Sequence, residues 1–354
     1  MLKSLLQKLE ETGSLSRAEF RRLIADRTPE LVEHAGARAK QLREQHFGNQ
    51  IFIRGLIEIS SYCRNNCYYC GIRRGNCHAE RYRLTPEQIL SCCELGYPLG
   101  FRTFVLQGGE DAWFTDERMV EIIRAIKSRY PDCAVTLSIG ERSFFSYKAF
   151  REAGADRYLL RHETANAEHY ARLHPARQTL NDRLRCLQDL RFLGYQTGTG
   201  FMVGSPFQTV ETLAEDLEFI QAFRPEMVGI GPFIPHHDTR FAGEPHGSLE
   251  LTLYLLSLLR LILPRGLLPA TTALGSIHPE GRELGVLAGA NVIMPNLSPP
   301  DVRKKYLLYD NKLNSGAEAA EGLAELRRRL AKIHCEIAVS RGDFSGKNQM
   351  TSKD

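Results

Sequence analysis

IFIRGLIEISSYCRNNCYYC, residues 51–70, joins a β-branched apolar run to three cysteines. The apolar run, 51–59, has the composition of a buried strand in a parallel sheet. Cys63, Cys67 and Cys70 follow where that strand ends. Three thiolates satisfy three irons of a cubane [4Fe–4S] cluster and leave the fourth iron open for a ligand. These residues therefore predict a parallel α/β fold with an open-site cluster after its first strand.

Further β-rich runs alternate with helix-period segments along the chain. The predicted strands are 51–59, 101–107, 134–139, 156–161, 196–203, 227–234, 267–274 and 290–295. The predicted helices between them are 85–96, 116–129, 143–153, 179–193, 209–223, 249–263 and 279–288. Strands separated by helices pair in parallel through right-handed crossovers, and eight such units favour a closed (β/α)8 TIM barrel. An open doubly wound sheet is the alternative, but no G-x-G-x-x-G follows the first strand.

One barrel with helical additions at both ends is the simplest organisation. Residues 1–50 are predicted as an N-terminal helical extension, with a helix start at Thr28. The barrel occupies 51–300 and a C-terminal helical segment 301–340. Residues 341–354 are a polar tail that we expect to be frayed.

Composition and charge exclude several classes of protein. The chain has 46 Lys and Arg against 42 Asp and Glu, a net charge of +4, and no basic block that would follow a nucleic-acid backbone. Its longest apolar run, 251–263, is too short to span a bilayer. The N-terminus lacks the apolar core of a signal peptide, and the nine cysteines are an odd number. We therefore expect reduced thiols in the cytoplasm, with no nucleic-acid or membrane partner.

A structural zinc site is the alternative interpretation of the cysteines. It would use Cys67 and Cys70 together with Cys63 and Cys77. Zinc knuckles prefer two paired sets of ligands, and Cys77 with its neighbour His78 is a poor second pair. The spacing and the position after a strand favour the cluster.

A glycine-rich turn, Gln107-Gly108-Gly109-Glu110-Asp111, follows the second predicted strand. Two glycines allow the backbone to approach a ligand closely, and the adjacent carboxylate could bind an ammonium group. A simple connection between a strand and a helix is the alternative, because two glycines would serve that turn equally well.

Three ionisable residues, Arg161-His162-Glu163, end the fourth predicted strand. Buried charges need partners, so this run indicates a polar site rather than packing. Arg161 could donate a fork of hydrogen bonds to a carboxylate, and Glu163 could accept from an ammonium or a ribose hydroxyl. A structural ion pair across the barrel mouth is the alternative. Arg183, on the following predicted helix, has by itself the character of a solvated surface residue.

Two threonines and two methionines mark the ends of later strands. Thr271 and Thr272 are adjacent on a predicted strand, so their side chains should point to opposite faces and at least one needs a polar partner in the barrel. Satisfaction by the backbone is the alternative for Thr272. Met202 and Met294 are candidates for contact with an adenine, although methionines there more often belong to the core.

The cysteine spacing resembles that of the radical S-adenosylmethionine (SAM) enzymes. Their signature, CxxxCxφC with φ aromatic, is matched by Cys63, Cys67, Tyr69 and Cys70. In that family the amino and carboxylate groups of SAM chelate the open iron, and an electron from the cluster cleaves SAM to a 5′-deoxyadenosyl radical. The resemblance implies that Tyr69 packs near the adenine and that Gly108-Gly109-Glu110 holds the methionine amino group.

Four longer strings resemble the [FeFe]-hydrogenase maturase HydE family. They are RYLLRHETAN (157–166), GIGPFIPH (229–236), PATTALG (269–275) and ANVIMPN (290–296), within a resemblance that runs from about Arg54 to about Tyr309. What it implies for the site is a cluster on Cys63, Cys67 and Cys70, contacts to SAM from Glu163, Arg183, Met202, Met294 and Tyr306, and a substrate or anion site lined by Arg161, Thr271 and Thr272.

The same resemblance implies a function and partners. A SAM-derived radical would act on a small cysteine-bearing organometallic iron species supplied by the maturase HydG, for assembly of the hydrogenase H-cluster on the scaffold HydF. A ferredoxin or flavodoxin would donate the electron. The chain departs from the family pattern in two places. Gly108 stands where many members have Ser, and 301–354 contains only Cys335, so we expect one [4Fe–4S] cluster and no second one.

Other functions remain open on the sequence. A biotin synthase-like enzyme needs a second cluster held by barrel strands, whereas Cys133 lies at the entrance of a predicted strand and Cys186 on a predicted helix. A methylornithine synthase-like enzyme shares the general barrel pattern. A non-catalytic iron–sulfur or zinc-binding scaffold is the alternative from a different class, and it predicts no cleavage of SAM.

Overall fold

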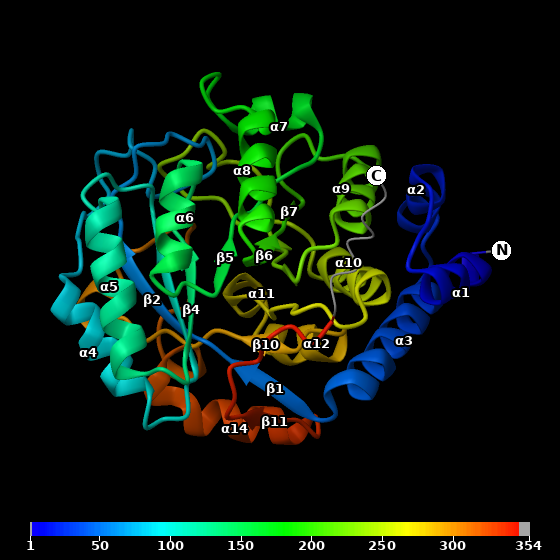
Figure 1. The fold of residues 1–354 in the computed structure, drawn as a ribbon. Coiled ribbons are helices and arrows are strands. Elements are labelled where there is room, and N and C mark those ends of the chain that lie inside the picture. The colour runs from blue at the N-terminus through cyan, green and yellow to red at the C-terminus, as the bar shows by residue number, and fades with distance from the viewer. Residues whose placement is uncertain (1, 347–354) are drawn as a thin grey trace, which may run out of the picture.

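A ring of parallel strands forms the centre of the computed structural model, which describes residues 2–346 (Figure 1). The strands are β1 (Gln50–Ile53), β2 (Gly55–Ser60), β3 (Thr103–Gly108), β4 (Ala134–Ser138), β5 (Arg157–Leu159), β6 (Gln196–Thr199), β7 (Met202–Val203), β8 (Met227–Val228), β9 (Gly231–Pro232), β10 (Val292–Ile293) and β11 (Glu336–Ala338). Hydrogen bonds join β2-β3-β4-β5-β6-β8 in order, and β10 pairs with β1. Parallel bridges from Met227 to Leu267 and from Pro269 to Val292 connect the two sets, which closes the predicted TIM barrel.

Helices cover the outside of this ring. They are α1 (Leu2–Thr12), α2 (Arg17–Ala25), α3 (Pro29–Phe47), α4 (Pro86–Gly96), α5 (Asp116–Arg129), α6 (Phe144–Glu152), α7 (Ala167–Leu173), α8 (Leu180–Phe192), α9 (Val210–Phe223), α10 (Leu249–Ile262), α11 (Thr272–Ile277), α12 (Gly281–Leu287), α13 (Pro300–Arg303) and α14 (Leu323–Lys332). No described helix is long and apolar enough to cross a membrane.

The first predicted strand is divided at Arg54 into β1 and β2. β1 pairs in parallel with β10 and β11, whereas β2 pairs with β3. The isoleucines and leucines of both halves are buried, as their composition predicts. The division lets one strand close the ring on one side and deliver the cysteines on the other.

The N-terminal helices lie against the outside of the barrel (Figure 1). Thr28 caps α3, its side chain accepting from the Leu31 amide, with Pro29 in the first turn. α3 packs on α10 and α2 on α9. The predicted helix start is therefore observed, and the extension shields two barrel helices from solvent.

The prediction of a strand over 267–274 is wrong in its second half. Thr271 precedes α11 with extended backbone angles, and Thr272 is the first residue of that helix. Adjacent side chains on a helix diverge by about 100°, not the 180° of a strand. The two threonines therefore do not point to opposite faces, and both line the same cavity.

The C-terminal segment is only partly helical. After α14 the chain forms β11, which pairs in parallel with β1 and was not predicted. The expectation of a frayed tail is wrong for 341–346, because the buried guanidinium of Arg157 bonds to the Arg341 carbonyl and to Asp343, each at 2.7 Å. A buried arginine needs such partners, and the tail supplies them. The rest of the predicted tail, 347–354, lies outside the described residues.

Candidate active site at the carboxyl end of the barrel

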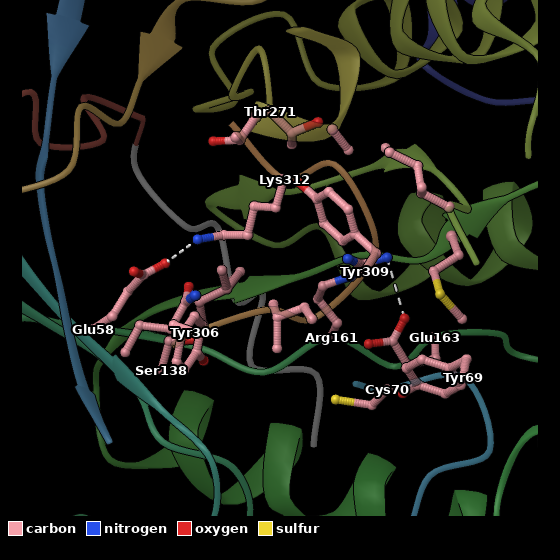
Figure 2. Close-up of a pocket in the computed structure, with 18 of the residues that line it drawn as sticks. Glu58, Tyr69, Cys70, Ser138, Arg161, Glu163, Thr271, Tyr306, Tyr309 and Lys312 are labelled. Carbon is pink, nitrogen blue, oxygen red and sulfur yellow. Dashed lines mark hydrogen bonds and ion pairs between the residues drawn. The ribbon is translucent and has the colours of Figure 1, made fainter. Parts of the chain in front are cut away.

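A cavity of about 340 Å³ opens among the carboxyl ends of the strands. The predicted site residues that line it are Cys67, Tyr69, Cys70, Gly108, Arg161, Glu163, Met202, Thr271, Thr272, Met294 and Tyr306. The other predicted residues, Cys63, Gly109, Glu110 and Arg183, are not among the residues that line it. Figure 2 shows Cys70 and Tyr69 on the side of Arg161 and Glu163. The fold thus brings residues from several strands to one cavity, as expected for a TIM barrel.

The cysteine loop is held in shape by one arginine. The guanidinium of Arg81 donates to the backbone carbonyls of Ser61, Ile72, Arg73 and Asn76. These bonds tie both ends of the loop to a single side chain. All three cysteines are half-buried and free of disulfides.

The arrangement of the thiols fits a cluster better than a single zinc ion. In a tetrahedral zinc site with Zn–S bonds of about 2.3 Å, the sulfur atoms lie roughly 3.8 Å apart. Among the described residues, His236, His237 and Asp310 are the group whose ligand atoms all lie within 4.8 Å of one another, so at least one pair of the three cysteine sulfurs is farther apart than that. Burial raises the pKa of Cys67 to about 12 and also raises the pKa of Cys63 and Cys70. Binding of iron must therefore release protons from these thiols.

The glycine-rich turn packs directly on the cysteine loop. A Cβ on Gly109 would lie 2.2 Å from the Tyr62 carbonyl oxygen and 2.7 Å from Cys63 Cβ, so only glycine fits there. Glu110 is buried, and its carboxylate accepts from Arg64 Nε and from the Glu141 amide, both at 2.8 Å. Gly108 faces the cavity, whereas Glu110 links the turn to its neighbours.

Tyr69, the aromatic of the cysteine motif, is held by a buried histidine. Its hydroxyl lies 3.2 Å from Nε2 of His174, whose Nδ1 lies 2.9 Å from the Tyr170 carbonyl. The His174 ring also stacks on Tyr170 with centroids 3.9 Å apart. Burial, followed by the charge of Arg183, lowers the pKa of His174 to about 3. The imidazole is therefore neutral. Its Nδ1 donates a hydrogen bond to the Tyr170 carbonyl, and its Nε2 accepts a hydrogen bond from the Tyr69 hydroxyl.

Arg161 and Glu163 face the cavity with unused polar atoms. Their ion pair, 3.1 Å between Nη2 and Oε2, does not have hydrogen-bond geometry, and Arg161 Nε and Thr271 Oγ1 are also buried without a partner. Glu163 adopts a left-handed backbone with φ of 65°, a strained conformation that recurs at functional sites. The ion pair between Arg161 and Glu163 thus exists, yet several of their polar atoms have no hydrogen-bond partner and can bind a ligand.

Two predicted residues of this region take other positions. His162, between Arg161 and Glu163, points out of the cavity, and its Nε2 lies 3.3 Å from the fully buried Asp216. Arg183 is buried rather than solvated, and it donates to Glu141 at 2.6 Å and to the Arg161 carbonyl. Arg183 therefore supports the backbone from which Arg161 projects.

Several lining residues were missed by the sequence analysis, notably Glu58 and Lys312. Their ion pair measures 2.6 Å, and Asn296 donates to the same carboxylate at 2.9 Å. Figure 2 shows this pair across the cavity from Glu163. A carboxylate inside the apolar run of the first strand was a usable signal that a polar partner lay nearby. Ser138 and Tyr309 also line the cavity, without any such signal.

His236, His237 and Asp310 form a second group of potential metal ligands. Asp310 Oδ1 lies 2.7 Å from His237 Nδ1 and 4.0 Å from His236 Nε2. Nδ1 of His236, however, accepts from the Asp238 amide at 3.1 Å. The proton of the neutral ring must then reside on Nε2, the atom that a metal would need. The group is better described as a histidine–carboxylate network.

Comparison with known proteins agrees with this geometry. The family model described as "Radical SAM superfamily" matches residues 57–220. The "[FeFe] hydrogenase maturase subunit HydE" of Thermotoga maritima is 47% identical over 275 residues, 78% of either chain. The 3-methylornithine synthase of Methanosarcina barkeri is 30% identical over 314 residues, 88% of this chain and 87% of that protein. A crystal structure of methylornithine synthase (PylB) has a TM-score of 0.83 at 27% identity and covers 94% of this chain and 97% of that one.

The TIM barrel, the three-cysteine loop and these matches define a radical SAM enzyme, with a [4Fe–4S] cluster and SAM as its cofactors. Within that superfamily the chain belongs to the family of the [FeFe]-hydrogenase maturase HydE, because it shares 47% of its residues with a HydE over 78% of its length.

Proposed function

We propose that this enzyme acts in the assembly of the [FeFe]-hydrogenase H-cluster, on a small cysteine-bearing iron species. When bound, the cluster and SAM supply reductive cleavage to a 5′-deoxyadenosyl radical. The observation that carries the proposal is a single cavity. Cys67 and Cys70 line it together with Arg161 and Thr271, which have polar atoms without hydrogen-bond partners. The 47% identity to a HydE supports the same substrate class.

The residues divide into three groups around the cavity, which would hold the cluster, SAM and the substrate. Cys63, Cys67 and Cys70 would hold the cluster, since their spread thiols suit a polynuclear centre. Residues proposed to contact SAM, or to position the groups that contact it, are Tyr69, Gly108, Gly109, Glu110, Glu163, Arg183, Met202, Met294 and Tyr306. Glu110 already accepts two hydrogen bonds, so its part is to position the turn while Gly108 offers backbone to the ligand. Arg183 acts in the same indirect way, through Glu141 and the Arg161 carbonyl.

Arg161, Thr271 and Thr272 would hold the substrate. A guanidinium binds a carboxylate through a fork of two hydrogen bonds, so Arg161 suits the carboxylate of a cysteine ligand. Thr271 offers a free hydroxyl, whereas the Thr272 hydroxyl already accepts from Arg282 at 3.2 Å. The Glu58–Lys312 pair closes the opposite side of the cavity. These groups bind and orient the substrate, and the radical chemistry belongs to the cofactors.

The proposed partners follow from the same assignment. HydG would supply the iron species, HydF would receive the product, and a ferredoxin or flavodoxin would donate the electron in the cytoplasm. One cluster per chain is proposed, because residues 301–354 contain only Cys335, and one thiol cannot hold a second cluster. Iron analysis of the reconstituted enzyme should give four irons per chain, and a markedly higher content would contradict a single cluster.

The decisive experiment is hydrogenase activation in a purified maturation mixture that lacks only HydE. Addition of this chain should restore hydrogen production, and an Arg161→Ala variant should not. A parallel incubation with lysine, SAM and dithionite tests the methylornithine synthase alternative that the 30% identity and the PylB fold keep in view. Formation of methylornithine, with no activation of hydrogenase, would overturn the proposal.

A further inference from the structure

Arginines without carboxylate partners surround the cysteine loop. They are Arg73, Arg74, Arg172, Arg177 and Arg240, which we call the basic collar. Within the described residues, none of the five lies within 4.0 Å of a carboxylate oxygen as an ion pair. All but the half-buried Arg73 are exposed. The collar therefore presents uncompensated positive charge to solvent.

The collar is attached to the loop by neutral contacts. The guanidinium of Arg240 lies 3.7 Å from the centre of the Tyr68 ring, and Tyr68 is one of the two residues between Cys67 and Cys70 in the sequence. Arg177 donates to the Arg64 carbonyl, and Arg73 donates to the Asn66 side chain at 3.0 Å. These contacts orient the guanidinium groups without neutralising them.

Two further members complete the arrangement. Arg74 belongs to the loop itself, where its amide bonds to the Asn65 carbonyl at 2.7 Å. Arg172 lies 3.4 Å above the ring of Phe207, and its neighbour Leu173 accepts from the Tyr68 amide at 3.0 Å. Four of the five collar residues thus contact the cysteine loop itself, and Arg172 adjoins it through Leu173.

The size of this charge is large for the chain. Its formal net charge is +4, so five unpaired arginines in one place exceed the whole excess, and acids and bases balance elsewhere. Three acidic residues near the collar have partners outside it. Asp238 contacts His78 at 2.9 Å, Glu80 contacts Lys305 at 3.4 Å, and Glu110 contacts Arg64. Such a concentration attracts and orients a partner of opposite charge.

We propose that the basic collar is the docking surface for a small, acidic, one-electron carrier protein. The inference rests on the proposed function, in which the cluster must be reduced before SAM is cleaved. Four collar residues contact the loop that carries the three half-buried cysteines, so a carrier seated on the collar would lie beside the loop that holds the cluster. In the step itself one electron passes to the cluster. The carrier is oxidised, the cluster is reduced, and no bond forms or breaks.

The test compares two electron donors with one set of variants. The collar variant is Arg74→Glu, Arg177→Glu and Arg240→Glu. The matched control, Arg124→Glu, Arg327→Glu and Arg328→Glu, makes the same change in net charge on exposed residues of α5 and α14. The rate of 5′-deoxyadenosine formation is measured with a reduced acidic flavodoxin and, separately, with dithionite.

The collar variant should lose at least about tenfold in kcat/KM for the flavodoxin, the lower range of electrostatic steering, while the control stays near wild type. Dithionite-driven cleavage should be unchanged in both. Added salt should slow the flavodoxin reaction of the wild type and have little effect on the collar variant. Equal flavodoxin rates in the collar variant and the control would overturn the proposal.

Further outcomes distinguish failure of the docking surface from misfolding of the variant and from failure of the proposed function. If the collar variant loses its cluster absorbance, Arg74→Gln with Arg240→Gln replaces it and must still slow the flavodoxin reaction selectively. If wild-type protein with an intact cluster cleaves no SAM under dithionite, the proposed function fails, and an electron carrier as the occupant fails with it. Normal dithionite activity with a salt-independent flavodoxin rate would refute the docking surface alone.

Discussion

Two arginines four residues apart, Arg157 and Arg161, occupy opposite ends of the barrel in opposite states. Arg157 is fully buried and donates to Thr103, to the Arg341 carbonyl and to Asp343. Arg161 keeps Nε and Nη2 without a hydrogen-bond partner beside the cavity. A satisfied buried cation stabilises a fold, whereas an unsatisfied one is available to a ligand. The amino end therefore serves structure and the carboxyl end serves chemistry.

The division is strong but not complete. Arg54, buried at the amino end just before β2, contacts Met227 Sδ at 3.0 Å and leaves Nε and Nη2 unpaired. Burial, together with the charge of Arg157, places the pKa of Arg54 well below its usual value. The C-terminal tail thus supplies hydrogen-bond partners to Arg157 but none to the neighbouring Arg54.

The largest effect is expected at the carboxyl end, from Cys67→Ala. Loss of one of three thiolate ligands should abolish both the cluster and the cleavage of SAM. Absorbance and EPR of the reconstituted protein, with chromatography of 5′-deoxyadenosine, measure this. Cys77→Ala is the matched control and should retain both properties. Loss of metal in Cys77→Ala would instead support the four-cysteine zinc site.

Arg161→Ala should lower substrate turnover about a hundredfold, the effect of removing charged hydrogen bonds worth roughly 2–3 kcal/mol. Its Tm should hardly change, because the wild-type guanidinium makes few bonds. Hydrogenase activation assays and calorimetry give the two values. Arg161→Lys should remain impaired, since an ammonium keeps the charge and lacks the fork. Turnover within twofold of wild type would remove Arg161 from the site.

At the amino end the same kind of change should affect stability instead. Asp343→Ala leaves the buried Arg157 without its carboxylate and should lower the free energy of unfolding by about 2 kcal/mol. SAM cleavage by the folded protein should be unaffected. Urea denaturation and a dithionite-driven assay at low temperature test this, with Asp343→Asn as the milder control. A normal unfolding midpoint would show that the tail does not secure this end.

The smallest effect is expected from Gly108→Ser. A Cβ there would lie 3.2 Å from Ile59 Cγ1, a contact that small shifts relieve, so SAM cleavage should stay within about twofold of wild type. Gly109→Ser is the matched contrast, because its Cβ would collide with the Tyr62 carbonyl and displace the cysteine loop. Equal activity of the two variants would mean that the turn does not pack on the loop as described.

Much of the carboxyl end was predictable because its residues are consecutive. The three cysteines with Tyr69 and the glycine-rich turn carry their chemistry within a few positions, and each follows a recognisable strand. Arg161 and Glu163 were found the same way. The predicted strand over 267–274 failed because its composition suits a buried strand equally well, whereas the chain turns at Thr271 into α11.

Residues brought together only by closure of the barrel could not be found in this way. Lys312 meets Glu58 across 254 positions, and Asp343 meets Arg157 across 186. The basic collar joins two chain segments to the cysteine loop, although the sequence has no basic block there. Local spacing encodes the ligands of a small cluster, since a loop can deliver them unaided. Ion pairs and clusters of surface charge depend on which distant segments the barrel brings side by side. Short-range sequence patterns do not predict these long-range contacts.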